Sequence, residues 1–412
     1  MTITHEQLAE RIRQARETVG FTQDEVAQAL EISRPAVAQI EAGNRKVSSL
    51  ELMKLARLFG RSMHDFFEES FERDGVAQVW RALPEARKDP QTVKGMSRGI
   101  ELVNAILGLE SMLGLQRLWG GLPQYSLEKP GTTWEAVTQG AELAEKERQR
   151  LQLGISPIVE PASVLEREGV LVLGLKLPAG VSGLTFLNKR AVTCAINAGD
   201  AATRQRFSLA HEYCHALLDL GASPGIVSRD AERKDPIEVR ADAFAAAFLM
   251  PAEGIRGFLA RLGKGQRSRA VAGARAREAD SSYEPRRAAK ARDVDIWDVT
   301  RLANFFGASR AAVIWRLFNL RIVSAHQRER LFEEEVKGYG KQLAGFVGGL
   351  DAELKPPERP RLPPAEQRLV SLAIDAASAD EIDRTKLVEL LELAGLTEDE
   401  VYEVPLAQRR HE

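Results

Sequence analysis

The sequence predicts an α+β protein with a helical N-terminal region, a central region that holds a small sheet, and a helical C-terminal region. Apolar residues recur at helical spacing over residues 1–70 and return to that spacing from Ile296 onward. Between them, the runs 170–173 and 191–196 are rich in β-branched residues and are bounded by Gly, Pro and Asn, which is typical of strands. The length of 412 residues is enough for about two or three domains at ~150 residues each.

Composition shifts along the chain predict four segments. We expect an N-terminal helical domain at 1–70, a helical linker region at 71–134, a main domain at 135–325 and an acidic helical region at 326–412. In the main domain, helices are predicted at about 201–218 and 237–250, and Pro251 stops the second. The Arg-, Gly- and Ala-rich stretch 263–292 has little apolar periodicity, so we predict a mobile loop there.

The charges of the chain are unevenly distributed. The total of 57 Lys and Arg against 59 Asp and Glu gives a net charge of -2, which excludes a uniformly basic protein. Residues 256–292 carry eleven bases and three acids, or +8, whereas residues 329–412 carry nineteen acids and eleven bases, or -8. The basic stretch is either a solvated insertion or a contact for a nucleic-acid activator. The acidic tail is a regulatory or homodimerisation element, or a cap on the basic stretch.

Cysteine usage and hydropathy indicate a cytoplasmic protein. The chain has two cysteines, Cys194 and Cys214, and no CxxC pair, which argues against a disulfide framework and fits a reducing compartment. It contains no apolar run long enough for a transmembrane helix, and its first fifteen residues lack the apolar core of a signal peptide. We therefore expect no membrane partner.

Residues 21–45 have the pattern of a helix-turn-helix. Thr22 and Glu25 form a predicted capping box at the first helix, and Ser33 is the predicted N-cap of the second. A recognition helix presents its N-terminal residues to the major groove, and residues at the neighbouring helix start and after the turn are placed for phosphates. The predicted DNA-binding residues are Gln23, Arg34, Pro35, Ala38, Gln39, Arg45 and Lys46. The alternative is a protein–protein module, because residues 1–67 carry nine bases and nine acids.

A metal-site motif, His211-Glu212-x-x-His215, lies in the predicted helix at 201–218. Residues four apart on a helix leave the same face, so the two imidazoles can share one ion. Imidazole nitrogen is a good ligand for Zn²⁺. Glu212 is rotated about 100° from His211, which suits a general base better than a ligand. The pattern predicts a hydrolytic metal centre.

A third ligand is needed, and spacing leaves it open. Glu238 lies near the start of the predicted helix 237–250, and Asp242 follows one turn later on the same face. Asp219, one turn after His215, is a geometric competitor.

Together these motifs resemble a known combination. Residues 10–67 resemble an XRE-family helix-turn-helix, on the stretch from Thr22 to Arg45. Residues of about 135–325 resemble an ImmA/IrrE-type (M78-like) zinc metallopeptidase, on Arg206–His215 and on the long run from Glu238 to Pro251. The resemblance implies a zincin-like fold, Zn²⁺ as cofactor, Glu238 as the third zinc ligand, and Asp242 as a residue that contacts a ligand.

The resemblance also implies an activity. The expected protein is a metallo-endopeptidase that cleaves an XRE-type transcriptional repressor, and so relieves repression in a stress, phage-defence or mobile-element response. The substrate is expected as an extended strand beside the site, with 191–197 as the edge strand and Phe186 and Tyr213 as weak wall candidates. The alternative is a DNA-binding transcriptional regulator whose peptidase-like domain is only a sensor.

Overall fold

The computed structural model describes residues 3–61, 63, 66, 67, 75–83, 90–115, 122–188, 191–264, 293–347 and 363–403. Helices at both ends of the chain flank a four-stranded mixed sheet, so the α+β prediction is confirmed. Most of the basic stretch, 265–292, lies outside the described residues. The prediction of a mobile loop there therefore stays a prediction.

The N-terminal region holds four helices within residues 3–61: α1 (His5–Val19), α2 (Gln23–Leu30), α3 (Arg34–Glu41) and α4 (Ser49–Phe59). The predicted capping box is present, since the Thr22 side chain accepts from the Glu25 N–H and the Glu25 carboxylate accepts from the Thr22 N–H. Ser33 occupies the N-cap position of α3, but its side chain makes no capping hydrogen bond. Val26, Leu30, Val37 and Ile40 are buried between the helices.

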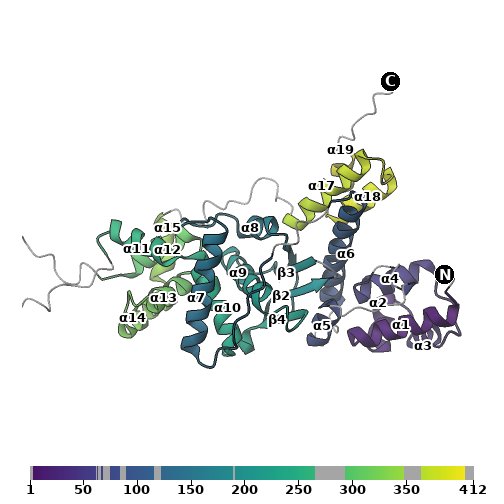
Figure 1. The fold of residues 1–412 in the computed structure, drawn as a ribbon, viewed down its shortest axis with the longest axis horizontal. Coiled ribbons are helices and arrows are strands. Elements are labelled where there is room, and N and C mark those ends of the chain that lie inside the picture. Colours follow the sequence, from purple (N-terminus) through teal and green to yellow (C-terminus); the bar gives the residue numbers. More distant parts are fainter. Residues whose placement is uncertain are drawn as a thin grey trace, which may run out of the picture.

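The next two helices carry the chain from this region to the sheet. They are α5 (Gly75–Ala82) and α6 (Pro90–Met112), and Figure 1 shows them between the N-terminal helices and the strands. Trp80 on α5 is fully buried, with its ring 5.1 Å from that of Phe21 in an edge-to-face arrangement. One apolar core therefore continues from the N-terminal helices to the sheet.

The sheet has the order β1-β3-β2-β4. Its strands are β1 (Leu171–Leu175), β2 (Val181–Asn188), β3 (Ala191–Asn197) and β4 (Gly225–Arg229). Because β3 pairs parallel with β1 and antiparallel with β2, it is an internal strand. The expectation that 191–197 forms the substrate edge is therefore wrong. In the described chain the edges are β1 and β4.

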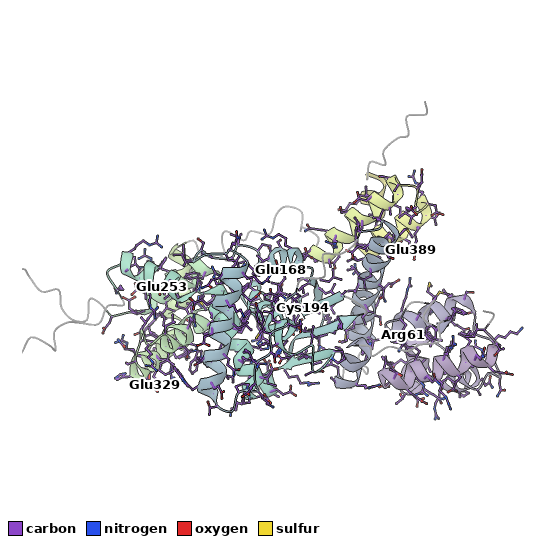
Figure 2. All side chains as sticks on the ribbon, viewed as in Figure 1. Arg61, Glu168, Cys194, Glu253, Glu329 and Glu389 are labelled. Carbon is purple, nitrogen blue, oxygen red and sulfur yellow. The ribbon has the colours of Figure 1, made fainter. Side chains whose placement is uncertain are left out.

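Side chains alternate between the two faces of the sheet. On β3, Ala195 joins the core shared with α5 and α6, whereas Cys194 points to the opposite core, beneath α9 (Ala202–Leu218). Figure 2 labels Cys194 in the middle of the molecule. The strands thus separate two cores, and α9 with its histidines belongs to only one of them.

Helices on the α9 side complete the main domain. They are α7 (Thr133–Arg150), α8 (Pro161–Arg167), α10 (Pro236–Leu249), α11 (Ala252–Arg261), α12 (Ile296–Phe306), α13 (Arg310–Asn319), α14 (Ala325–Val336) and α15 (Tyr339–Val347). α7 packs so closely along α10 that a Cβ at Gly140 would overlap the backbone at Arg240 and Phe244. The helix boundaries predicted at 201–218 and 237–250 agree with α9 and α10 to within a residue.

The C-terminal helices are α17 (Pro364–Ser378), α18 (Arg384–Leu393) and α19 (Glu398–Glu403). Figure 1 shows α17 and α18 against the end of α6, and Arg368 makes a 2.5 Å ion pair with the buried Glu110 of that helix. Leu369, Leu372 and Ala373 of α17 are buried in the core on the β1 side. This part of the acidic tail is therefore built into the fold beside α6.

In the described part of the chain, no single helix has the length and hydropathy needed to cross a membrane. The pair α10 and α11 meets the criterion only when taken together, across a 47° bend.

Candidate metal centre

Two helices, α9 and α10, hold the side chains of the site. His211 and His215 are both buried on α9, and Glu238 is buried in the first turn of α10. The far end of α10 is held by buried guanidinium groups: Arg148 donates to the Phe248 carbonyl and Arg316 to the Met250 carbonyl. Burial lowers the pKa of each of these two arginines to about 10.

Three ligand atoms converge between the helices. His211 Nε2 lies 3.1 Å from His215 Nε2 and 3.1 Å from Glu238 Oε2, and His215 Nε2 lies 3.4 Å from Glu238 Oε1. In the described part of the chain these three residues form a cluster whose ligand atoms all lie within 4.8 Å of one another. Of the three acids that spacing left open, Glu238 is the one at this centre.

The other two acids lie on the outer side of the imidazoles. The Asp242 carboxylate is 2.9 Å from His211 Nδ1, and the Asp219 carboxylate is 2.8 Å from His215 Nδ1. Arg240 Nη2 donates to the second oxygen of Asp219 at 2.6 Å. Each histidine is therefore oriented by a carboxylate, which is the usual arrangement around metal-binding imidazoles.

The donor set fits a divalent cation. A carboxylate can only accept, so Asp242 and Asp219 assign the N–H of each imidazole to Nδ1 and leave the two Nε2 lone pairs facing the Glu238 carboxylate. Such a group of acceptors is stabilised by a cation at its centre or by protons on the imidazoles. Two imidazole nitrogens and one carboxylate oxygen, with a further position open, match the ligands of a catalytic zinc.

The electrostatics of the donor set agree with this. Burial lowers the pKa of His211, but the carboxylates of Asp242 and Glu238 outweigh it and raise that pKa to about 10. Burial also lowers the pKa of His215, but the carboxylates of Asp219 and Glu238 outweigh it and raise that pKa to about 9. Burial would raise the pKa of Glu238, yet its contacts with both histidines lower it to about 2. The centre therefore favours positive charge.

Glu212 lies beside this centre, between α9 and β2. Its side chain is fully buried, Oε2 accepts a 2.6 Å hydrogen bond from Thr185 Oγ1, and Oε1 has no hydrogen-bond partner among the described residues. A Cβ at Gly183 would overlap this carboxylate, so β2 can pass close to α9 only with glycine there. Glu212 thus has one oxygen held and one oxygen free for another ligand.

Sequence reasoning missed Thr185 and Gly183, because β2 carries no strong strand pattern around its glycine. Two wall candidates lie elsewhere. Phe186 is buried in the core on the opposite face of the sheet, and Tyr213 is fully buried with its hydroxyl donating to Glu147 at 2.7 Å. Neither can line a substrate channel, because Phe186 faces the other core and the Tyr213 hydroxyl is bound to Glu147.

The predicted DNA-binding residues fall into two groups. Arg34, Pro35, Gln39 and Lys46 are exposed, and Ala38 is half-buried on the same helix as the first three. Gln23 instead donates to Glu41 at 2.9 Å, and Arg45 makes a 2.7 Å ion pair with Glu51. Arg34 also lies 3.6 Å from Asp24. The exposed side chains of α3 are therefore free to contact a partner. Gln23 and Arg45 would first have to break their contacts with Glu41 and Glu51.

Comparison with protein families agrees with this architecture. Residues 12–66 match the helix-turn-helix family, and residues 165–318 match the IrrE N-terminal-like domain of the M78 peptidases. The chain joins a helix-turn-helix domain to an IrrE N-terminal-like domain. The IrrE-like match runs from α8 to α13, so it contains His211, Glu212, His215 and Glu238. No curated protein matches the chain.

Proposed function

We propose that the chain is a zinc-dependent endopeptidase that cleaves an XRE-type transcriptional repressor. The observation that carries this proposal is the pairing of the His211-His215-Glu238 cluster with a buried carboxylate, Glu212, that has one unpartnered oxygen. A binding site for a structural ion has no use for such a base. The match to an M78 peptidase domain supports the same conclusion.

The residues of the site divide the chemistry between them. A divalent cation on His211, His215 and Glu238 would supply Lewis acidity, which lowers the pKa of water and polarises a peptide carbonyl. Thr185 holds Oε2 of Glu212, so Oε1 accepts the proton from the attacking water. Glu212 then returns this proton to the nitrogen of the departing amine. Burial of Glu212 excludes bulk water from the transfer.

The peptide would add to β4. This strand pairs with β2, which carries Thr185 and Gly183, and no further strand pairs with β4 in the described chain. An extended peptide paired with such an edge is held by its main chain, which suits a protein substrate.

The test uses purified protein, Zn²⁺ and an XRE-type repressor encoded beside the gene. We expect Glu212→Gln to keep the metal and lose cleavage, and His215→Ala to lose both. Cleavage by the Glu212→Gln protein would contradict the mechanism. Metal analysis of the purified protein also decides between zinc and manganese or iron, which tolerate the same ligands.

The helix-turn-helix domain supports a second role. The exposed Arg34, Pro35 and Gln39 of α3 suit contacts with bases, so the alternative function is a DNA-binding regulator whose IrrE-like domain only senses metal or ligand. This alternative predicts operator binding that Arg34→Ala and Gln39→Ala abolish, with no cleavage of any repressor. We place either role in a stress, phage-defence or mobile-element response in the cytoplasm, where the two free cysteines would stay reduced.

A further inference from the structure

A large groove lies beside the metal centre, and neither the peptide edge nor the helix-turn-helix accounts for it. Its volume is about 1390 Å³, and its walls come from α7, α9, α10, α13 and the start of α14. We call it the α7–α13 groove. Figure 1 shows these helices together on the side of the sheet away from the N-terminal region.

The groove adjoins the ligand set through Asp242. Asp242, which lines it, contacts His211 Nδ1 at 2.9 Å, and its side chain is 37% exposed. Phe207, another lining residue, lies one helical turn before His211 on α9. A polypeptide at the metal centre would therefore extend into the groove within a few residues.

The lining is aromatic, with cations at the rim. Trp134 on α7 is 61% exposed and Trp315 on α13 is 49% exposed, although tryptophan is usually well buried in a folded chain. Arg321 lies over the Trp134 ring at 5.3 Å, and Arg328 lies over the Trp315 ring at 4.8 Å. Tryptophan and arginine are among the residues that contribute most to the binding energy of protein interfaces.

Arg321 has an unusual backbone conformation. Its φ is +56°, in the position after α13 where glycine is the favoured residue. A side chain kept there despite this preference is consistent with a role for its guanidinium at the rim. It also means that Arg321→Gly removes the charge without straining the backbone.

The size of the groove indicates what kind of molecule it binds. Pockets for small molecules are typically about 300–1,000 Å³, and this groove is larger and opens beside the peptidase site. We propose that the α7–α13 groove binds the substrate polypeptide on one side of the scissile bond, through large apolar side chains on Trp134 and Trp315 and neighbouring acidic side chains on the arginine rim. This inference rests on the proposed peptidase function and assigns its specificity.

The test uses the zinc-loaded, full-length Glu212→Gln protein, immobilised, and a proteome-derived library of peptides of 10–20 residues. We expect retained peptides to be enriched in Phe, Leu or Trp next to Asp or Glu. Trp134→Ser with Trp315→Ser should lower their retention at least ten-fold, and Arg321→Gly should weaken the acidic preference while leaving the apolar preference unchanged. Trp297→Ser is the matched control, since Trp297 is 36% exposed on α12 and does not line the groove.

The outcomes test the groove assignment and the proposed peptidase activity separately. Equal retention by the double tryptophan variant, or no retention by the Glu212→Gln protein, would overturn the groove assignment even if the wild type cleaves peptides. A shift from dimer to monomer in the double variant, with peptide retention unchanged, would assign the groove to a second copy of this chain and also overturn it. Tryptophan-dependent retention without cleavage by the wild type would support the groove and refute the proposed peptidase.

For cleaved peptides, the double variant should raise KM at least ten-fold and leave kcat within two-fold.

Discussion

Thr185 Oγ1 donates a 2.6 Å hydrogen bond to Glu212 Oε2, and this contact joins strand β2 to the helix that carries both histidines. Both residues are fully buried, so the bond is shielded from water. It determines which oxygen of Glu212 stays free. The site therefore depends on the sheet as well as on the two helices that supply the ligands.

The first prediction concerns this bond. Thr185→Val keeps the shape of the side chain and removes the donor, so Glu212 loses its orientation. We expect kcat to fall by about ten-fold or more with metal content and KM nearly unchanged. The control is Thr193→Val on β3, because the buried Thr193 hydroxyl has no hydrogen-bond partner in the described part of the chain and its loss should leave kcat unchanged. Equal effects of the two changes would refute a positioning role for Thr185.

The second prediction concerns the close passage of β2. Gly183→Ala forces a methyl group onto the Glu212 carboxylate, so we expect kcat to fall by about a hundred-fold while zinc is retained. Gly174→Ala on β1 is the control, since its Cβ would meet the Ala198 side chain at an ordinary 3.5 Å. Steady-state kinetics and metal analysis on both proteins check this. An active Gly183→Ala protein would mean that Glu212 is not the base.

The third prediction concerns pH. Before an ion binds, the pKa of His211 is about 10 and that of His215 about 9, so both imidazoles are protonated between pH 6 and pH 8 and an incoming ion must displace two protons. We expect zinc affinity to fall about a hundred-fold for each pH unit between pH 8 and pH 6. Calorimetric titration in buffers of different ionisation enthalpy counts these protons. Affinity that does not change with pH would show that the histidines are not ligands.

The fourth prediction concerns stability away from the site. Burial raises the pKa of Glu166 on α8 to about 7, and its Oε1 has no hydrogen-bond partner within the residues that the structure describes. The folded state therefore binds a proton that the unfolded state releases above pH 4.5, and stability falls as pH rises from 4.5 to 7. Glu166→Gln should stabilise the protein at pH 8 by on the order of 1 kcal/mol and have little effect at pH 4.5. The exposed Glu142→Gln on α7 is the control in thermal unfolding, and a gain that is equal at both pH values would contradict this assignment.

The fifth prediction concerns the link between the two domains. Trp80 is fully buried against Phe21 and is part of the core that reaches the sheet. Trp80→Ala should lower the free energy of unfolding by about 3–5 kcal/mol, and Trp80→Phe by less. Because α5 joins the domains, Trp80→Ala should also split one unfolding transition into two, as followed by calorimetry. A single unshifted transition would show that the helix-turn-helix domain does not depend on this contact.

Local patterns determined much of this protein. The four-residue spacing of His211 and His215 on α9, the capping box of Thr22 and Glu25, and the end of α10 before Pro251 are all readable from the sequence. They depend on residues within one or two helical turns, where spacing alone sets which side chains share a face. The bounds of α9 and α10 were predictable for the same reason.

The tertiary structure decided what depends on distant residues. Spacing could not choose among Glu238, Asp219 and Asp242, because the choice depends on how α10 packs against α9 and α7. It also could not order the strands, so β3 was mistaken for an edge, and Thr185 and Gly183 were missed. Strand pairing and the contact of a sheet with a helix join residues far apart in the chain, and no local period records them.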